Sequence, residues 1–84
     1  DLDCLDPSAA PAVSNIEPGV NGFSVDEAIE LMHAVRGMNI IGGDVVCLMP
    51  KKDTPNQITA MVAAAVMFEM ISRIAELKIK NAIA

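Results

Sequence analysis

The sequence predicts an α/β fold in which helices cover a parallel sheet. Its elements follow the order strand end, long loop, helix, strand and helix, which is the order found around parallel sheets. The second apolar run, residues 40–49, is nearly continuous rather than alternating, as in a strand covered on both faces. Two strands and two helices do not cover both faces of a sheet. We therefore expect a fragment of a three-layer αβα fold, or an obligate oligomer.

The chain is predicted to begin with the end of a strand. Residues 1–6 form this end, because Asp6-Pro7 stops any regular element. The loop that follows, residues 7–22, contains three prolines and two glycines. A structureless stretch of this length is usually functional or disordered. Its position beside acidic residues favours a functional loop.

The pattern that follows this loop predicts a helix that ends at Arg36. Ser24 and Glu27 have the spacing of a capping box, and Phe23 stands where a hydrophobic staple would begin. Gly37 supplies the stop signal at the other end. The apolar residues recur at helical spacing: Val25, Ala28, Ile29, Met32 and Val35.

The second half of the chain predicts a buried strand and a long helix. Pro50 closes the β-branched run 40–49, and a loop leads to a helix from about Gln57 to about Lys80, capped by Thr54 or Asn56. The first half of this helix is apolar nearly all round, so we expect it to be buried on several sides. Two pairs have favourable i,i+4 spacing: Glu69 with Arg73, and Glu76 with Lys80.

Composition limits the size of the protein and its partners. With 84 residues the chain forms at most one small domain, and its net charge of −5 argues against nucleic acid or an anionic membrane surface as partner. The longest unbroken apolar run, Ala60 to Phe68, is far shorter than the roughly 20 residues of a membrane-spanning helix. Cys4 and Cys47 are expected to be reduced thiols, which predicts a cytoplasmic location.

Three carboxylates at the start of the chain are the leading candidate site. Asp1 and Asp3, at i and i+2, would point to the same side of an extended segment, with Asp6 adjacent. A solvated acidic terminus is the simplest interpretation. An EF-hand loop is excluded because Leu5 and Asp6 occupy positions that need an oxygen ligand and a glycine. A phosphotransferase with an aspartate nucleophile and a hydrolase with two metal ions remain alternatives.

A series of short motifs resembles the ureohydrolases, the family of arginase and agmatinase, and most closely its plant-type branch. The similarity extends from the first residue to about Ile74. An Asp-x-Asp pair alone would be a weak signal, but an ordered series over some sixty residues is a strong one. The matching segments are Asp1–Pro7, Ala10-Pro11, Glu17-Pro18-Gly19, Gly22-Phe23-Ser24, Gly43–Val46, Pro50, Asp53 and Thr59-Ala60.

The resemblance implies a fold, a reaction and a set of metal ligands. Residues 1–84 would be the C-terminal segment of a single three-layer αβα domain whose site holds two manganese ions. Such enzymes hydrolyse guanidino groups to urea and an amine. Asp1 matches the carboxylate that bridges the two ions, and Asp3 matches a ligand of the second ion; Asp44 lies in a family strand motif and is not assigned to metal.

Three features depart from the family pattern. The earlier histidine and aspartate ligands of the family are absent, and His33, in mid-helix, is expected at the surface or an interface rather than on a metal. Cys47 stands where a glutamate usually meets the substrate guanidinium, and a thiol cannot supply that charge-assisted bond. We expect Cys47 to be a buried strand residue without a base to make it a nucleophile. Val20-Asn21 are inserted after the Glu-Pro-Gly motif.

Two functions follow as alternatives. The first is the C-terminal portion of a manganese-dependent ureohydrolase that takes a small guanidino substrate; this chain alone, with no complete catalytic set, is expected to be inactive. The second is a non-catalytic ureohydrolase-like fragment that forms a homo-oligomer through its exposed sheet edge and its apolar helix faces. The apolar run Ala60 to Phe68 and the substitution at Cys47 favour the second alternative.

Overall fold

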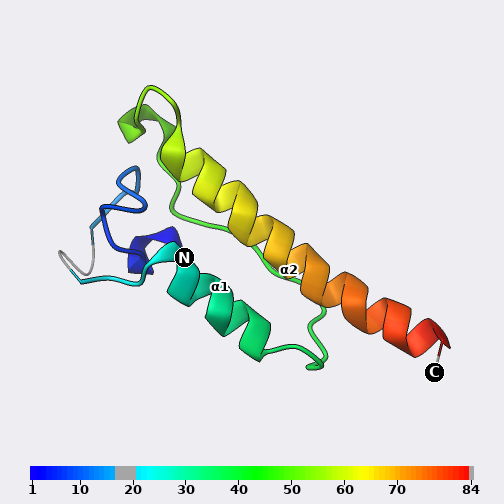
Figure 1. Ribbon diagram of the computed structural model, residues 1–84. Coiled ribbons are helices and arrows are strands. Elements are labelled where there is room, and N and C mark those ends of the chain that lie inside the picture. The colour runs from blue at the N-terminus through cyan, green and yellow to red at the C-terminus, as the bar shows by residue number, and fades with distance from the viewer. Residues whose placement is uncertain (17–20, 84) are drawn as a thin grey trace.

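The computed structural model describes residues 1–16 and 21–83, which form two α-helices and two short 3-10 turns. In chain order these are η1 (Leu2–Cys4), α1 (Val25–Ala34), η2 (Pro50–Lys52) and α2 (Ile58–Ile83). The helices α1 and α2 lie side by side, and extended segments connect them (Figure 1). Within the described residues there is no β-strand, so the predicted parallel sheet, and with it the αβα layering, is wrong for this chain.

Both predicted strands are replaced by irregular backbone. Residues 2–4 close into the turn η1 instead of extending, and the run 40–49 makes no ladder. A strand requires a neighbour that offers N–H and C=O groups along its whole length. Among the described residues the two segments form only isolated bridges: Leu5 forms a parallel bridge with Phe23, and Leu48 forms an antiparallel bridge with Val13. The amide of Leu2 also donates to the carbonyl of Val46 at 3.2 Å.

The start of α1 follows the sequence prediction. The Ser24 hydroxyl accepts from the Glu27 amide at 3.1 Å, and the Glu27 carboxylate accepts from the Ser24 amide at 3.0 Å, so the capping box is present. Helical geometry ends at Ala34, two residues before the predicted end. Gly37 has φ +85°, the left-handed conformation that a glycine adopts without strain.

The start of α2 is held by Asp53, a residue of the family motif that was not predicted to cap the helix. The Asp53 carboxylate accepts from the amides of Thr59 and Ala60, each at 3.0 Å. Partial desolvation acts to raise the pKa of Asp53, but these amide donors outweigh it and hold the pKa below its ordinary value. The predicted cap Thr54 also takes part, because its hydroxyl oxygen accepts from the Ile58 amide at 3.1 Å.

A small apolar core lies where η1, the following loop and the start of α2 meet. The loop is therefore partly buried: Ala12 is fully buried, and its amide donates to the buried Thr59 hydroxyl at 3.1 Å. The Ala12 carbonyl accepts from the amide of Met49 at 2.8 Å, which ties the loop to the segment before η2. The buried apolar cluster comprises Leu2, Leu5, Ala10, Val13 and Val62, and is called the core cluster below.

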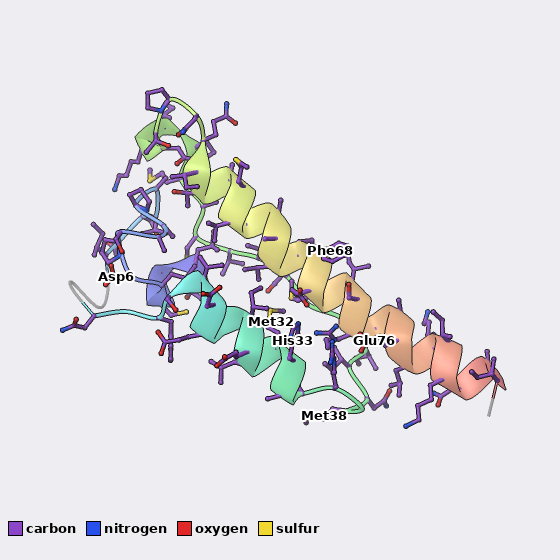
Figure 2. All side chains as sticks on the ribbon, viewed as in Figure 1. Asp6, Met32, His33, Met38, Phe68 and Glu76 are labelled. Atoms are coloured by element: carbon purple, nitrogen blue, oxygen red, sulfur yellow. The ribbon has the colours of Figure 1, made fainter. Side chains whose placement is uncertain are left out.

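Most of α2 is exposed, which contradicts the predicted burial on several sides. Met61 is 64% exposed and Phe68 is 67% exposed, and Phe68 points away from α1 (Figure 2). By length and composition alone α2 could cross a membrane, and 17% of its most apolar window is buried. A core helix of a soluble protein passes the same test, so this is a weak indication. The predicted absence of a membrane partner stays a prediction.

Candidate metal centre

Two carboxylates and one thiol converge beside η1. Asp1, Asp3 and Cys47 each offer one ligand atom, and these atoms all lie within 4.8 Å of one another. Asp1 is exposed, whereas Asp3 and Cys47 are half-buried. We call these three residues the carboxylate–thiol cluster. From the sequence we expect Asp1 and Asp3, but not Cys47, in a common metal site.

The turn η1 brings the two carboxylates together. Asp1 is the N-cap of this turn, and its Oδ1 accepts from the Asp3 amide at 3.3 Å. The predicted reason for their proximity, alternation along an extended strand, is therefore wrong, although the pairing itself is present. A tight turn needs one chain reversal rather than a neighbouring strand, so it forms from local residues alone.

Cys47 reaches the carboxylates through a contact between distant segments. The hydrogen bond from the Leu2 amide to the Val46 carbonyl sets residue 46 against η1. Cys47 itself has φ +74°, which is uncommon for a residue with a Cβ. Cys47 is a free thiol in irregular backbone. The prediction that it is a buried strand residue is therefore wrong, because it is half-buried and lies at the site.

Asp6 has a structural role away from the cluster. Its carboxylate accepts from the hydroxyl and the amide of Ser8, and from the amide of Gly22 at 3.0 Å. The hydrogen bonds from Ser8, followed by the one from Gly22, hold the pKa of Asp6 below its ordinary value. Asp6 is thus used to close the loop that follows it. Of the inserted Val20-Asn21, Val20 lies outside the described residues, as does the Glu17-Pro18-Gly19 motif.

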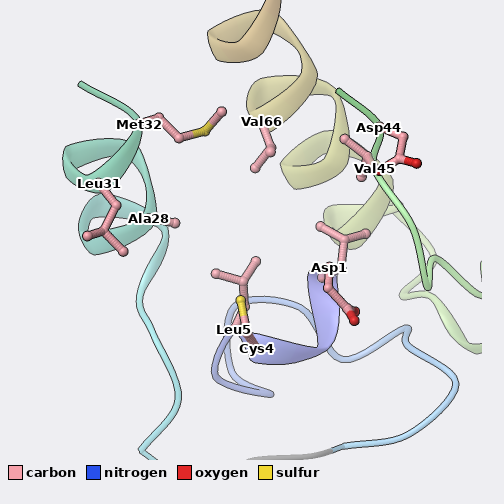
Figure 3. Close-up of a pocket in the computed structure, with 10 residues that line it drawn as sticks. Asp1, Cys4, Leu5, Ala28, Leu31, Met32, Asp44, Val45 and Val66 are labelled. Atoms are coloured by element: carbon pink, nitrogen blue, oxygen red, sulfur yellow. The ribbon is translucent and has the colours of Figure 1, made fainter. Parts of the chain in front are cut away.

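A cavity of about 210 Å³ opens next to the cluster. Asp1 and Asp44 contribute the charged groups of its lining, and Met32 of α1 and Val66 of α2 face one another across it (Figure 3). The remaining lining is mostly apolar. The cavity can therefore take a small organic molecule with a hydrocarbon part and a positive charge.

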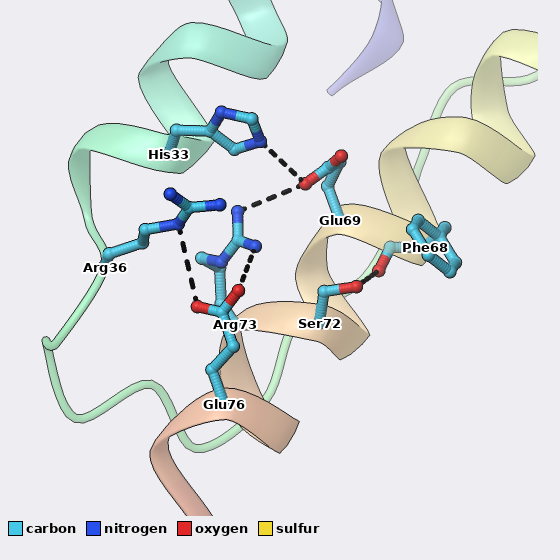
Figure 4. A network of polar contacts seen from close by, with 7 residues as sticks. All are labelled: His33, Arg36, Phe68, Glu69, Ser72, Arg73 and Glu76. Atoms are coloured by element: carbon cyan, nitrogen blue, oxygen red, sulfur yellow. Dashed lines mark hydrogen bonds and ion pairs between the residues drawn. The ribbon is translucent and has the colours of Figure 1, made fainter. Parts of the chain in front are cut away.

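His33 belongs to a polar network between the helices and not to the carboxylate–thiol cluster. Its Nε2 lies 3.2 Å from Glu69 Oε2, and its side chain is 42% exposed (Figure 4). The prediction of a surface or interface position for His33 is confirmed. We call the network the far-end network; its members are His33, Arg36, Glu69, Arg73 and Glu76.

Arg73 is the centre of the far-end network. It donates to Glu69 at 3.1 Å, the predicted i,i+4 pair, and to Glu76 at 2.7 Å. The hydrogen bond from Arg73 is the main reason that the pKa of Glu76 lies below its ordinary value. Glu76 is also 3.7 Å from Arg36. The predicted pair of Glu76 with Lys80 is not among the ion pairs of the described residues.

Comparison with known proteins places this chain in a family. Residues 1–72 match the Arginase family. Mitochondrial arginase 1 of Oryza sativa subsp. indica is 43% identical over 76 residues, which are 90% of this chain and 22% of that protein. Mitochondrial arginase 1 of Arabidopsis thaliana is 42% identical over 76 residues, 90% of this chain and 21% of that protein. An agmatinase of Sodalis glossinidius is 44% identical over 71 residues, 84% of this chain and 22% of that protein.

The chain spans about a fifth of the length of these curated relatives. Most of each relative therefore has no counterpart among these 84 residues.

Proposed function

The chain belongs to the arginase family, and from this premise we propose that it forms part of a ureohydrolase that releases urea from a small guanidino compound. The relatives that it matches are arginases and agmatinases, and the family consists in general of metal-dependent hydrolases. The single observation that carries the proposal is the convergence of Asp1 and Asp3 in one cluster. Two carboxylates with adjacent oxygens are a donor set for divalent cations.

Asp1 and Asp3 supply part of the donor set that a pair of manganese ions requires. Manganese prefers carboxylate and water oxygens, which Asp1 and Asp3 provide. When bound, such a metal pair supplies a water molecule acidified enough to attack at neutral pH. In our proposal Asp1 and Asp3 hold the cations, and the remaining ligands come from residues outside these 84.

The cavity beside the cluster supports a guanidino substrate. A guanidinium is positively charged, and the Asp44 carboxylate gives the lining negative charge next to apolar walls. In the reaction, water adds to the guanidino carbon, and the bond between that carbon and the nitrogen that carries the alkyl group breaks. This nitrogen takes up a proton and leaves as the amine, and the carbon remains in urea. The chain's own residues bind and orient the substrate and the cations around that carbon.

The test measures metal binding and urea release together in the full-length protein. Asp1→Asn and Asp3→Asn should each weaken manganese binding. The loss should exceed the roughly 10–100-fold that is typical when a residue that only hydrogen-bonds to a metal ligand is removed. Urea release should fall in parallel. Glu30→Gln, which removes an exposed carboxylate of α1, is the matched control and should change neither quantity. Unaltered manganese binding in both aspartate variants would refute the proposal.

The isolated chain gives a second, independent readout. Because the other ligands lie outside these 84 residues, the purified chain with manganese should release no urea. Release at a rate above the metal-only blank would mean that the chain holds a complete site.

A second candidate function is structural association, and the exposed face of α2 favours it. Ile71 is 58% exposed and Ile79 is 62% exposed, in addition to Met61 and Phe68. Apolar residues that recur along an exposed helix usually mark a contact surface. Sedimentation of the chain distinguishes the candidates: a stable monomer would count against association, and a dimer dispersed by Phe68→Glu would support it.

A further inference from the structure

We propose that Cys47 is itself a metal ligand, so that the site has two oxygen donors and one sulfur donor and prefers zinc or cobalt to manganese. The proposal rests on the metal site of the proposed function and goes beyond it, because it assigns Cys47 to the metal and changes which metal is bound. It starts from the carboxylate–thiol cluster, in which the Cys47 sulfur lies within 4.8 Å of an oxygen of Asp1 and of Asp3.

The spacing of the three atoms suits a single small ion. Zinc binds thiolate sulfur at about 2.3 Å and carboxylate oxygen at about 2.0–2.2 Å, in tetrahedral geometry. Neighbouring ligand atoms around such an ion lie roughly 3.5 Å apart. The three atoms can reach this spacing by closing about 1 Å, which rotation about side-chain bonds supplies. Because the cluster is half-buried at Asp3 and Cys47, the ion would still be open to substrate on one side.

The backbone holds Cys47 at this position independently of any ion. The Leu2 amide and the Val46 carbonyl, 3.2 Å apart, join the turn with Asp1 and Asp3 to the residue before Cys47. Leu2 is buried in the core cluster at 3% exposure, so this attachment has a fixed base. The donor atoms therefore meet because of packing between segments more than forty residues apart in sequence.

Other roles for this thiol fit the structure less well. A nucleophilic cysteine needs a base such as histidine. The single histidine of the chain, His33, contacts Glu69 in the far-end network. Cys4, the other cysteine, is exposed and is not a member of the carboxylate–thiol cluster. Metal ligation by Cys47, in contrast, needs only the donor groups of the carboxylate–thiol cluster.

The chemistry of the donors sets the expected metal. When the ion binds, the S–H bond breaks, its proton passes to solvent, and the sulfur donates an electron pair to the ion. Soft thiolate ligands favour zinc over manganese, which prefers oxygen donors. A serine in place of Cys47 offers an oxygen instead and should remove this preference.

The experiment titrates the metal-free, full-length protein with cobalt(II), zinc or manganese. Cobalt bound to a thiolate shows a sulfur-to-metal charge-transfer band in the near ultraviolet. We expect this band in the wild type and in the control Cys4→Ser, and its loss in Cys47→Ser. Zinc affinity of Cys47→Ser should fall by more than about tenfold, whereas manganese affinity should be retained. X-ray absorption of the zinc-loaded wild type should show a sulfur neighbour at about 2.3 Å.

The outcomes separate this proposal from the proposed function. If cobalt binds in a manner that depends on Asp1 and Asp3 but gives no charge-transfer band, Cys47 is not a ligand and the metal-dependent function stands. If none of the three metals binds, both proposals fail. The X-ray absorption measurement uses only wild-type protein, so misfolding of Cys47→Ser cannot mask the answer.

Discussion

Two parts of α2, its start and its middle, are attached to the rest of the chain by different kinds of contact. At its start, Val62 belongs to the core cluster, Thr59 is buried and the Asp53 carboxylate caps the helix. Further along α2, Glu69 contacts His33 of α1, and Glu76 pairs with Arg36, which follows α1. One attachment depends on apolar burial and the other on ion pairs.

This difference predicts how each part responds to conditions. Burial of apolar surface is non-directional and is little affected by moderate salt. Ion pairs near the surface weaken as salt screens them, because the Debye length falls to about 10 Å at 0.1 M. The middle of α2 should therefore separate from α1 under conditions that leave the start of α2 in place.

Truncation in the core cluster should have the largest effect. Leu5 is 4% exposed, and Leu5→Ala should lower the free energy of unfolding by about 2–5 kcal/mol. Leu31→Ala removes the same atoms from a residue that is 55% exposed and should cost less than about 0.5 kcal/mol. Denaturant unfolding of both variants measures the difference. Equal losses would show that the cluster is not the main apolar attachment.

A substitution that creates a steric clash with the backbone at Gly22 should have the next largest effect. A Cβ at Gly22 would lie 2.6 Å from the Asp6 amide nitrogen, and backbone atoms cannot move aside cheaply. Gly22→Ala should therefore cost about 1–3 kcal/mol, the range typical of overpacking. Gly42→Ala is the control, since a Cβ there meets nothing within 4 Å. Thermal unfolding of the pair should separate them clearly.

Acid should weaken the far-end network through Glu76. Its pKa is lower in the folded state, so its contribution to stability is present above the unfolded value of about 4.3 and is lost as pH falls through the folded value. Stability measured from pH 6 to pH 2 should therefore fall more in the wild type than in Glu76→Gln. A higher salt concentration at pH 6 should reduce the difference in stability between the wild type and Glu76→Gln. Glu30→Gln should behave as the wild type, and parallel curves for all three proteins would exclude a role for the network.

Removing His33 should have the smallest effect. The contact of His33 with Glu69 is partly exposed, and pairs at the surface contribute about 0.2–1 kcal/mol. His33→Ala should lose no more than this, and His33→Gln, which keeps a hydrogen-bonding side chain, should lose less. Chemical unfolding at low salt is the most sensitive measurement. A loss as large as that of Leu5→Ala would mean that the start and the middle of α2 are not held differently.

The sequence predicted what depends on neighbouring residues. The capping box of Ser24 and Glu27, the i,i+4 pair of Glu69 with Arg73 and the long second helix involve positions only a few residues apart. Such signals act within one or two turns and do not need the rest of the fold. The predicted pair of Glu76 with Lys80 has the same spacing but is not among the ion pairs of the described residues, since Glu76 contacts Arg73 and Arg36 instead.

What depends on distant segments was not predictable. The apolar run 40–49 resembles a buried strand, but hydrophobicity does not supply the neighbouring backbone that a strand needs. The family resemblance marks Cys47 only as a substituted residue. Its proximity to Asp1 and Asp3 depends on the hydrogen bond between Leu2 and Val46, which joins distant segments and has no signal in the sequence. Its positive φ is also invisible in the sequence, since a cysteine gives no signal for that conformation.

Attachment at two points also fixes the rotation of α2 about its own axis. A helix of 26 residues is about 39 Å long, and a single attachment at its start would let the far part twist or bend away. With Arg73 turned toward α1, Phe68 is directed to the opposite side (Figure 4). The far-end network thus sets the direction in which the exposed apolar residues Met61, Phe68, Ile71 and Ile79 of α2 face. We expect loss of the charge at Glu76 to loosen the orientation of this apolar face, although Glu76 is not one of its residues.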